Sequence, residues 1–180
     1  MKELSLNVLD IAQNSIVAGA SLITIETLEA VADDRLTIRI ADNGRGMSAE
    51  QVKSVIDPFY TTRTTRKVGL GIPLFKMAAE MADGGLEIAS APGVGTTVTA
   101  TFRLSHVDRM PIGDMEGTVS ALIHMNPELD FVYRRSFGEK AFTLDTRELR
   151  EVLEGVPLNT PEVNVWINEF LSENLKEIKA

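Results

Sequence analysis

The sequence predicts an α+β fold, a two-layer sandwich in which helices lie on one face of a mixed, mostly antiparallel sheet. Stretches in which apolar and polar residues alternate occur in pairs, which is typical of β-hairpins. Stretches with apolar residues three and four positions apart lie between them, which is typical of amphipathic helices. The 180 residues are enough for one stable core, and because the sequence has no cysteine, disulfides and thiolate chemistry are excluded.

The net charge of −8 restricts the classes of partner. Residues 1–105 carry 10 basic and 12 acidic side chains, whereas residues 106–180 carry 8 and 14. Because nucleic-acid binding normally needs a basic face, we expect no nucleic-acid partner. No apolar run approaches the roughly 20 residues that cross a bilayer, and the N-terminus lacks a secretory pattern. We therefore expect a cytoplasmic protein that does not engage a membrane.

The first half of the chain predicts a helix followed by a hairpin. Residues 3–18 carry apolar side chains at helical spacing, and Gly19 ends that pattern. Residues 22–28 and 35–40 alternate with period two across a polar turn, which predicts an antiparallel pair. Ser48 with a glutamine three residues later predicts a capped short helix to about residue 55. The next expected elements are a loop over 60–67, a helix over 72–82, and a second hairpin with strands over 86–89 and 97–104.

The pattern changes after His106, so we divide the chain into a domain over 1–105 and a C-terminal extension over 106–180 that packs on or extends the same sheet. Asp145 and Glu148 are expected to form a capping box at the start of a helix. The extension is predicted to contain a hairpin with strands over 119–124 and 131–136, a short strand over 141–144, a helix to about 153, and a last helix over 161–178.

Asp10 and Asn14 are four residues apart, so their side chains point to the same face of the first helix. A carboxylate can orient a water or take its proton, and an amide oxygen is a ligand that suits Mg²⁺. Alone, the pair is typical of an exposed helix face. The glycine-rich segments that follow favour a site instead.

Asp42 follows a buried-looking strand and is followed by Gly44 and Gly46. An aspartate at a strand exit can accept a hydrogen bond from an exocyclic amine, and glycines let the backbone approach a flat ring. The same residues are also typical of a tight turn, so a binding site and a simple turn both stay open as interpretations. Further along, Thr96 and Thr97 point to opposite faces of a strand, so only one of them can reach such a site.

The segment Gly69-Leu70-Gly71 opens a predicted helix, where free N–H groups attract anions such as phosphates. Basic side chains precede it, and they either reach phosphate oxygens or belong to a solvated loop. These basic residues are Arg63, Arg66 and Lys67.

In this order, the segments resemble the ATP-binding domain of the GHKL superfamily (Bergerat fold), to which DNA gyrase, heat-shock chaperone ATPases, mismatch-repair ATPases and histidine kinases belong. The resemblance covers residues 5–105. Residues 10–20 resemble the N box in its mismatch-repair version, and residues 42–47 resemble the first glycine box. Residues 57–63, 69–71 and 93–97 resemble the remaining boxes as they occur in histidine kinases.

The resemblance implies a role for each segment. Asn14 would hold Mg²⁺ and Asp42 would take the adenine amino group, with Gly46 and Thr96 completing that site. Residues 60–68 would form a mobile lid. Asp10 is the expected catalytic residue, because it stands where the hydrolytic members keep a glutamate. The implied ATP-binding residues are Asn14, Asp42, Gly44, Gly46, Met47, Thr62, Arg63, Lys67, Gly69, Leu70, Gly71 and Thr96.

The chain departs from the family pattern in several places. Asp10 is one methylene shorter than glutamate, and Val17 occupies a position where relatives often carry a charge. The N box begins within ten residues of the first residue, so we expect no helical hairpin with a phosphoacceptor histidine. His106 and His124 lie in or beside predicted strands and are expected to be structural.

These features leave three hypotheses for the function. The first is a stand-alone kinase module, histidine-kinase-like or of the anti-sigma type, that phosphorylates a partner protein in trans. The second is an ATPase whose lid closure switches a partner interaction, and the third is a non-catalytic nucleotide sensor. The acidic C-terminal part either extends the hydrophobic core or forms a docking surface. The last helix is also a candidate for the contact in a homodimer. The docking surface would comprise Glu148, Glu151, Glu154, Glu169, Glu173 and Glu177.

Overall fold

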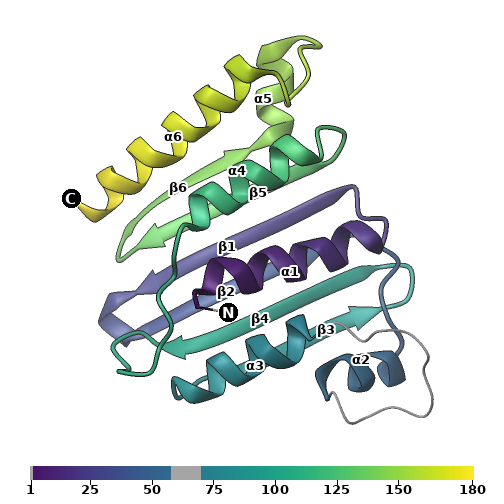
Figure 1. The fold of residues 1–180 in the computed structure, drawn as a ribbon, viewed down its shortest axis with the longest axis vertical. Coiled ribbons are helices and arrows are strands. Elements are labelled where there is room, and N and C mark those ends of the chain that lie inside the picture. Colours follow the sequence, from purple (N-terminus) through teal and green to yellow (C-terminus); the bar gives the residue numbers. More distant parts are fainter. Residues whose placement is uncertain (1, 58–69) are drawn as a thin grey trace.

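The computed structural model describes residues 2–57 and 70–180 and confirms the predicted fold class. Figure 1 shows a single sheet with helices packed on it. Its strands are β1 (Leu22–Ala30), β2 (Arg35–Asp42), β3 (Gly85–Ala91), β4 (Gly95–Arg103), β5 (Asp130–Phe137) and β6 (Lys140–Asp145). The helices are α1 (Leu4–Val17), α2 (Ala49–Ile56), α3 (Gly71–Met81), α4 (Met115–Met125), α5 (Thr146–Leu153) and α6 (Pro161–Lys179), with a 3₁₀ turn at Val31–Asp33.

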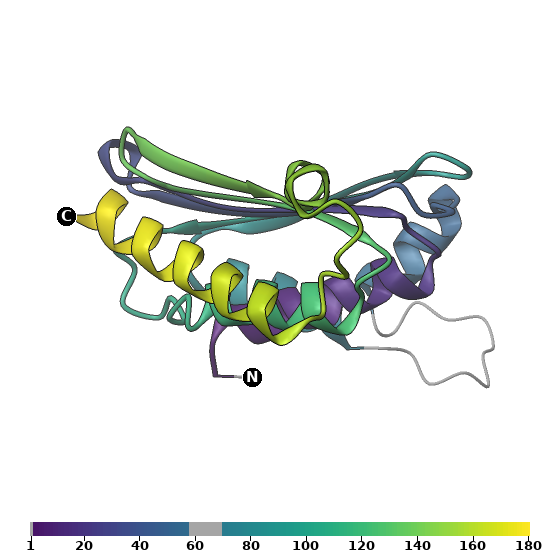
Figure 2. The ribbon, with the colours of Figure 1, turned by 90° about the horizontal axis from the view of Figure 1, so that it is seen from above.

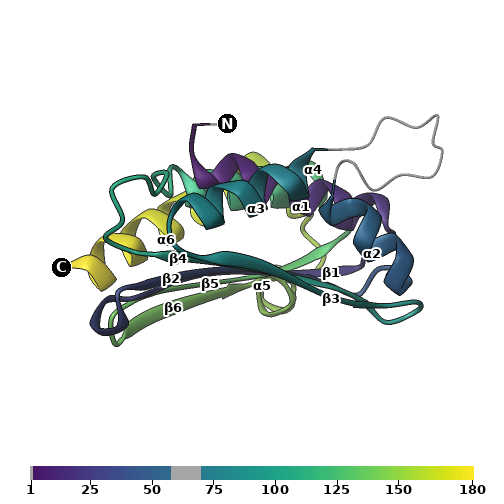
Figure 3. The same cartoon turned by 90° about the horizontal axis from the view of Figure 1, so that it is seen from below.

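The six strands lie in the order β3-β4-β2-β1-β5-β6. All neighbouring strands are antiparallel except β1 and β5, which are parallel, so the sheet is mixed. Figures 2 and 3 show α1, α3, α4 and α6 in one layer on one face of the sheet. The short helix α5 lies outside that layer.

Side chains alternate between a buried and a solvated face of the sheet because successive residues of a strand point to opposite sides. In β1, Ile23 and Ile25 are buried below the helices, and in β2 Leu36, Ile38 and Ile40 are buried beside them. The opposite face is polar; there Glu26 and Arg39 form an ion pair at 3.0 Å. The single core therefore lies between the sheet and the helix layer.

The predicted strand over 119–124 is wrong, because these residues belong to helix α4. Asp114 caps that helix by accepting a hydrogen bond from the N–H of Gly117 at 2.9 Å. Val119, Leu122 and Ile123 are buried together, at helical rather than strand spacing. The β-branched residues of this stretch misled the prediction. His124 accordingly lies on a helix and is exposed.

The C-terminal strands complete the sheet in a way that the predicted hairpin did not anticipate. β5 pairs in parallel with β1, from Leu22 opposite Asp130 onward, and β6 pairs with β5 across a turn at Gly138. The short strand predicted over 141–144 is confirmed as part of β6. The boundary at residue 105 remains a prediction, although strands from both sides of it lie in one sheet.

Several local predictions are confirmed. Ser48 and Gln51 form the expected capping box of α2, and α6 runs over the predicted stretch. At α5, Asp145 caps the helix by accepting a hydrogen bond from the N–H of Arg147 at 2.9 Å. This bond replaces the expected capping box with Glu148. Within residues 2–57 and 70–180, no helix is both long enough and apolar enough to span a bilayer.

Candidate functional site

Asp42 lies at the end of β2, and each of its carboxylate oxygens accepts a hydrogen bond. The hydroxyl of Ser15 on α1 donates to Oδ2 at 2.6 Å, and the N–H of Gly44 donates to Oδ1 at 2.8 Å. Ser15 is buried, so its bond to Asp42 is shielded from water. Because the donors come from two different segments, the orientation of the carboxylate is fixed. Each oxygen keeps a free lone pair for a further donor.

The turn after Asp42 is fastened first to the region between α1 and β1. The side-chain oxygen of Asn43 accepts from the N–H groups of Ser21 and Leu22 at 2.8 and 3.0 Å. The N–H of Arg45 donates to the carbonyl of Ala18 at 2.9 Å. These bonds hold the end of β2 close to the last turn of α1.

The same turn is fastened on its other side to the hairpin between β3 and β4. The N–H of Met47 donates to the hydroxyl of Ser90 at 2.8 Å. Gly46 has a φ of +72°, and a Cβ there would overlap the carbonyl oxygen of Ala91. A Cβ at Gly95 would likewise overlap the carbonyl oxygen of Asp42. Glycine is thus required at both positions because two backbones approach directly.

Thr96 is the predicted threonine that the structure brings to Asp42. The two residues are register partners on β4 and β2, so their side chains lie on the same face. That face is the one covered by the helices, because Val98 two residues further on is buried. The hydroxyls of Thr96 and Ser90 are 2.8 Å apart. Thr97 faces away from this group.

Asp10 lies on α1 directly beside the start of α3. A Cβ placed on Gly71 would lie 3.2 Å from the Cβ of Asp10 and 3.8 Å from its Oδ2. Leu70 is the N-cap of α3, so the unpaired N–H groups of the first helical turn begin next to this carboxylate. The arrangement places a proton acceptor at a helix N-terminus, where anions are favoured.

Asn14 lies one turn beyond Asp10 on the exposed face of α1. Its side chain takes part in no hydrogen bond among the residues that the structure describes, so its amide oxygen is available to a ligand. Over the same residues no group of three or more His, Cys, Asp or Glu side chains could hold a metal ion. An oxygen donor beside a phosphate-binding helix start fits Mg²⁺, which uses few protein ligands together with phosphates and water.

The group of residues around Asp42 and the group around Asp10 thus lie together at one end of the sheet. The last turn of α1, the end of β2, the start of α3 and the β3–β4 turn lie toward the right of Figure 1. Within the described residues, the structure places there Asp10, Asn14, Asp42, Gly44, Gly46, Met47, Leu70, Gly71 and Thr96. The predicted site residues Thr62, Arg63, Lys67 and Gly69, together with the lid over 60–68, lie outside the described residues.

The site is supported by polar residues that were not predicted from the sequence. Ser15 and Ser90 each bond to a predicted site residue, and Asn43 anchors the turn. Ser15 could have been found from its position, because it follows Ile11 by four residues and Ala12 by three. It therefore lies on the helix face that these two residues turn toward the sheet. The partnership of Ser90 with Met47 spans 43 positions and has no local signal.

Residues 1–106 match the family model of histidine kinase-, DNA gyrase B-, and HSP90-like ATPases. The non-motile and phage-resistance protein of Caulobacter vibrioides is 33% identical over 97 residues, which are 51% of this chain and 12% of that protein. The signal transduction histidine-protein kinase AtoS of Escherichia coli is 35% identical over 99 residues, which are 55% of this chain and 16% of that protein. The chain therefore spans less than a fifth of the length of these curated relatives.

Two solved structures share the fold at low sequence identity. The N-terminal domain of a DNA repair protein has a TM-score of 0.57 and 15% identity, covering 81% of this chain and 52% of that chain. The Aquifex aeolicus MutL ATPase domain complexed with ADP has a TM-score of 0.50 and 17% identity, covering 86% and 70%. Because these shares exceed the part matched by the family model, the likeness of fold extends beyond residue 106.

Proposed function

Because the chain belongs to the family of histidine kinase-, DNA gyrase B-, and HSP90-like ATPases, we propose that it binds Mg-ATP and transfers the γ-phosphoryl group to a side chain of a partner protein. The observation that carries this proposal is the placement of Asp10 beside Gly71, at the start of α3. A carboxylate at that place adjoins the helix N-terminus that would receive phosphates.

Asp42 would recognise the adenine ring. Its two oxygens are already oriented by Ser15 and Gly44, so a free lone pair can accept a hydrogen bond from the exocyclic amine without further ordering of the side chain. Thr96 lies opposite on β4 and supplies a hydroxyl on the same face. Gly44 and Gly46 keep the neighbouring backbone free of side chains that would block a flat ring.

The opposite end of the site would position the reacting groups. Asn14 would hold Mg²⁺ by its amide oxygen, and the metal when bound neutralises phosphate charge. The N–H groups at the start of α3 would bind phosphate oxygens. Asp10 would accept the proton of the attacking side chain of the partner. The nucleophilic atom of that side chain would bond to the γ-phosphorus while the bond between the γ-phosphorus and ADP breaks.

The named relatives support a kinase. AtoS, and the sensor histidine kinase ZraS of Klebsiella oxytoca at 31% identity over 83 residues, are histidine kinases by name. The second candidate is an ATPase switch, in which Asp10 takes the proton of a water molecule instead. The position of Asp10 beside Gly71 suits either nucleophile, so it supports this candidate as well.

Incubation with γ-labelled ATP and Mg²⁺, alone and with cell extract, tests the proposal. We expect label on a partner protein; free phosphate in the absence of a partner would favour the ATPase switch. Asp10→Asn keeps the size of the side chain but removes the base, so turnover should fall about 100-fold or more with unchanged affinity for ADP. Asp108→Asn, in an exposed turn away from the site, is the matched control. Turnover that survives Asp10→Asn would exclude Asp10 from the chemistry.

A further inference from the structure

An apolar groove lies at the far edge of the sheet from the candidate functional site, between α5, α6 and the end of β6. α5 and α6 lie at the top of Figure 1. The groove has a volume of about 660 Å³. Its apolar lining consists of Leu144, Leu149, Val152, Leu153, Val156, Val163, Trp166 and Phe170.

Large apolar side chains of the groove are left open to solvent. Val152 is 80% exposed, and Trp166, the only tryptophan of the chain, is 46% exposed. The ring of Trp166 stacks on that of Phe170 at 5.1 Å, and Phe170 packs edge-on against Phe142 at 6.2 Å. The exposed indole is therefore held in place by contacts that reach the core, which is the kind of rigid aromatic anchor that dominates protein interfaces.

The rim of the groove is acidic. Its lining includes Asp145, Glu148 and Glu162, and within the described chain it includes neither lysine nor arginine. Glu151 and Glu154 are exposed nearby and take part in none of the ion pairs between described residues. The groove thus combines an apolar floor with an acidic border.

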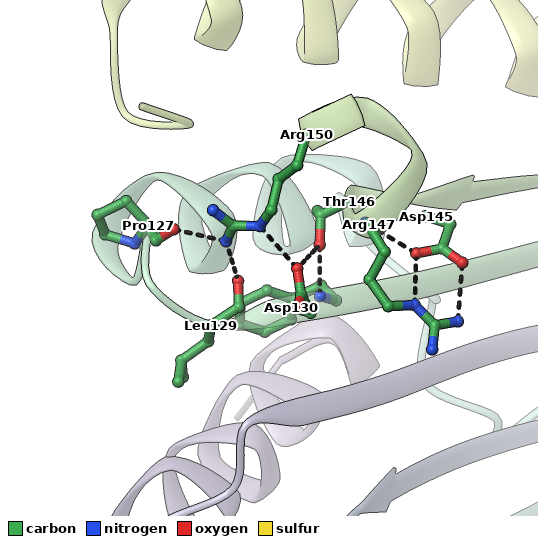
Figure 4. Close-up of polar contacts among 8 residues, drawn as sticks. Pro127, Leu129, Asp130, Asp145, Thr146, Arg147 and Arg150 are labelled. Carbon is green, nitrogen blue, oxygen red and sulfur yellow. Dashed lines mark hydrogen bonds and ion pairs between the residues drawn. The ribbon is translucent and has the colours of Figure 1, made fainter. Parts of the chain in front are cut away.

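The two arginines of α5 leave Glu148 and Glu162 of this border without an ion pair among the described residues, because Arg147 pairs with Asp145 and Arg150 pairs with Asp130. Figure 4 shows Arg147 bonded to Asp145, with Nη2 2.8 Å from Oδ2. Arg150 bonds to Asp130 at 2.8 Å and to the carbonyls of Pro127 and Leu129 at 2.6 and 2.8 Å. The contacts of Arg150 fix α5 to the start of β5.

We propose that this groove binds a basic amphipathic helix of a partner protein. A helix laid between two helices can place its apolar stripe on the exposed floor, and lysines or arginines beside that stripe would meet the acidic border. A second copy of this chain is a poor occupant, because the same acidic borders would face each other. The proposal does not depend on nucleotide binding, since the groove and the candidate functional site share no residue.

Trp166 provides a direct probe of the groove. The full chain would be titrated with a synthetic peptide of about 16 residues that has leucines at helical spacing and lysines elsewhere. We expect a saturable change in tryptophan fluorescence that weakens at high salt. A peptide with the same leucines but glutamates in place of the lysines should bind at least about tenfold more weakly.

Two matched variants separate the groove from the rest of the acidic surface. Val152→Arg adds a charged side chain inside the groove, and Val165→Arg makes the same change on α6 at a residue that is 54% exposed and outside the lining. Peptide affinity should fall about tenfold or more for Val152→Arg and less than about twofold for Val165→Arg. Glu162→Lys should weaken binding through the border alone. Because all three residues are exposed, circular dichroism should confirm that each variant is folded.

Four results would overturn the proposal. The first is an unchanged Trp166 signal, and the second is equal binding of the lysine and glutamate peptides. The third is an equal effect of Val152→Arg and Val165→Arg on peptide affinity. The fourth is a dimer in sedimentation that Val152→Arg dissociates, because a second copy would then be the occupant. None of these results bears on ATP binding, so the proposed function would stand or fall separately.

Discussion

Ser15 is the residue on which the orientation of Asp42 depends most directly. Its hydroxyl donates the shorter of the two hydrogen bonds to that carboxylate, at 2.6 Å, and it is only 3% exposed. Loss of the hydroxyl would leave Oδ2 free to rotate away from the proposed adenine position. Preorganisation, rather than a direct ligand contact, is thus the expected contribution of Ser15.

Ser15→Ala should lower the affinity for ADP by about tenfold while lowering the free energy of unfolding by only about 1 kcal/mol. Calorimetry with ADP and urea unfolding measure the two effects. Ser5→Ala is the matched control, because Ser5 is equally buried on α1 but donates to Glu3, away from the site. A similar loss of affinity in both variants would mean that the serines act only through the stability of α1.

A second residue-scale feature is a buried charge cluster on the core side of the sheet. Arg135 of β5 is 2% exposed and pairs with Glu29 of β1 at 3.1 Å and with Glu116 of α4 at 3.2 Å. The hydroxyl of Tyr133 donates to the same Glu116 at 2.7 Å, and burial together with Glu116 raises the pKa of Tyr133 above its ordinary value of 10.0. The cluster joins strands and a helix from both sides of residue 105.

Arg135→Met should destabilise the fold by about 3 kcal/mol or more, because it leaves the buried Glu116 without its cation and leaves Glu29 only the longer pair with Lys179, at 3.9 Å. Arg134→Met, the neighbouring change on the solvated face, should alter the free energy of unfolding by less than about 0.5 kcal/mol. Urea unfolding of both variants checks the difference. If the two variants were equally stable, the cluster would not hold the strands together.

At the scale of elements, local patterns predicted most of the fold. Alternation in β1 and β2, and the Ser48 cap of α2, are properties of short stretches, and the structure confirms them. α4 was misassigned because Val119 and Ile123 favour strands locally, while burial against α1, β5 and α6 decides for helix. The parallel pairing of β5 with β1 has no local signal, since the partners are more than 100 residues apart in sequence.

The candidate site shows the same division. Asp42 and Thr96 could be predicted because glycines mark their segments, whereas their meeting follows from the register of β2 and β4. The contact of Asp10 with Gly71 depends on how α1 and α3 pack, which periodicity alone does not determine. Sequence therefore identified the chemical groups, and tertiary packing determined which of them meet.

Helix α5 depends on an ionised cap. The Arg147 side chain, which donates to Asp145, holds the pKa of that carboxyl below its ordinary value of 3.8. A carboxyl with a lowered pKa stabilises the fold fully above 3.8, and this contribution is lost as the pH falls through the pKa of the folded state.

Asp145→Asn keeps a capping side chain but cannot ionise. The stability advantage of the wild type over this variant should therefore be constant above about pH 5 and should shrink as the pH falls below the ordinary pKa of an aspartate. Urea unfolding at a series of pH values measures it. A difference between the two proteins that stays constant down to acid pH would show that the charge of Asp145 contributes nothing.

At the scale of the whole molecule, one sheet runs through the chain. β1 pairs with β2 on one side and with β5 on the other, so it is a central strand to which both parts of the chain contribute neighbours. The buried residues form one cluster that includes Ile25 and Phe102 together with Phe131 and Leu171. Separation after residue 105 would leave the backbone N–H and C=O groups of β1 that face β5 unpaired.

We therefore expect the two parts of the chain to unfold in a single transition. Trp166 reports on the edge near β6, and an Ile88→Trp change in a Trp166→Phe background reports on the opposite edge at β3. In each protein, the urea midpoint from fluorescence should coincide with that from far-UV circular dichroism, because neither edge keeps its core without the other. A Trp166 transition that precedes the loss of circular dichroism would instead mean that residues 106–180 form a separate, less stable unit.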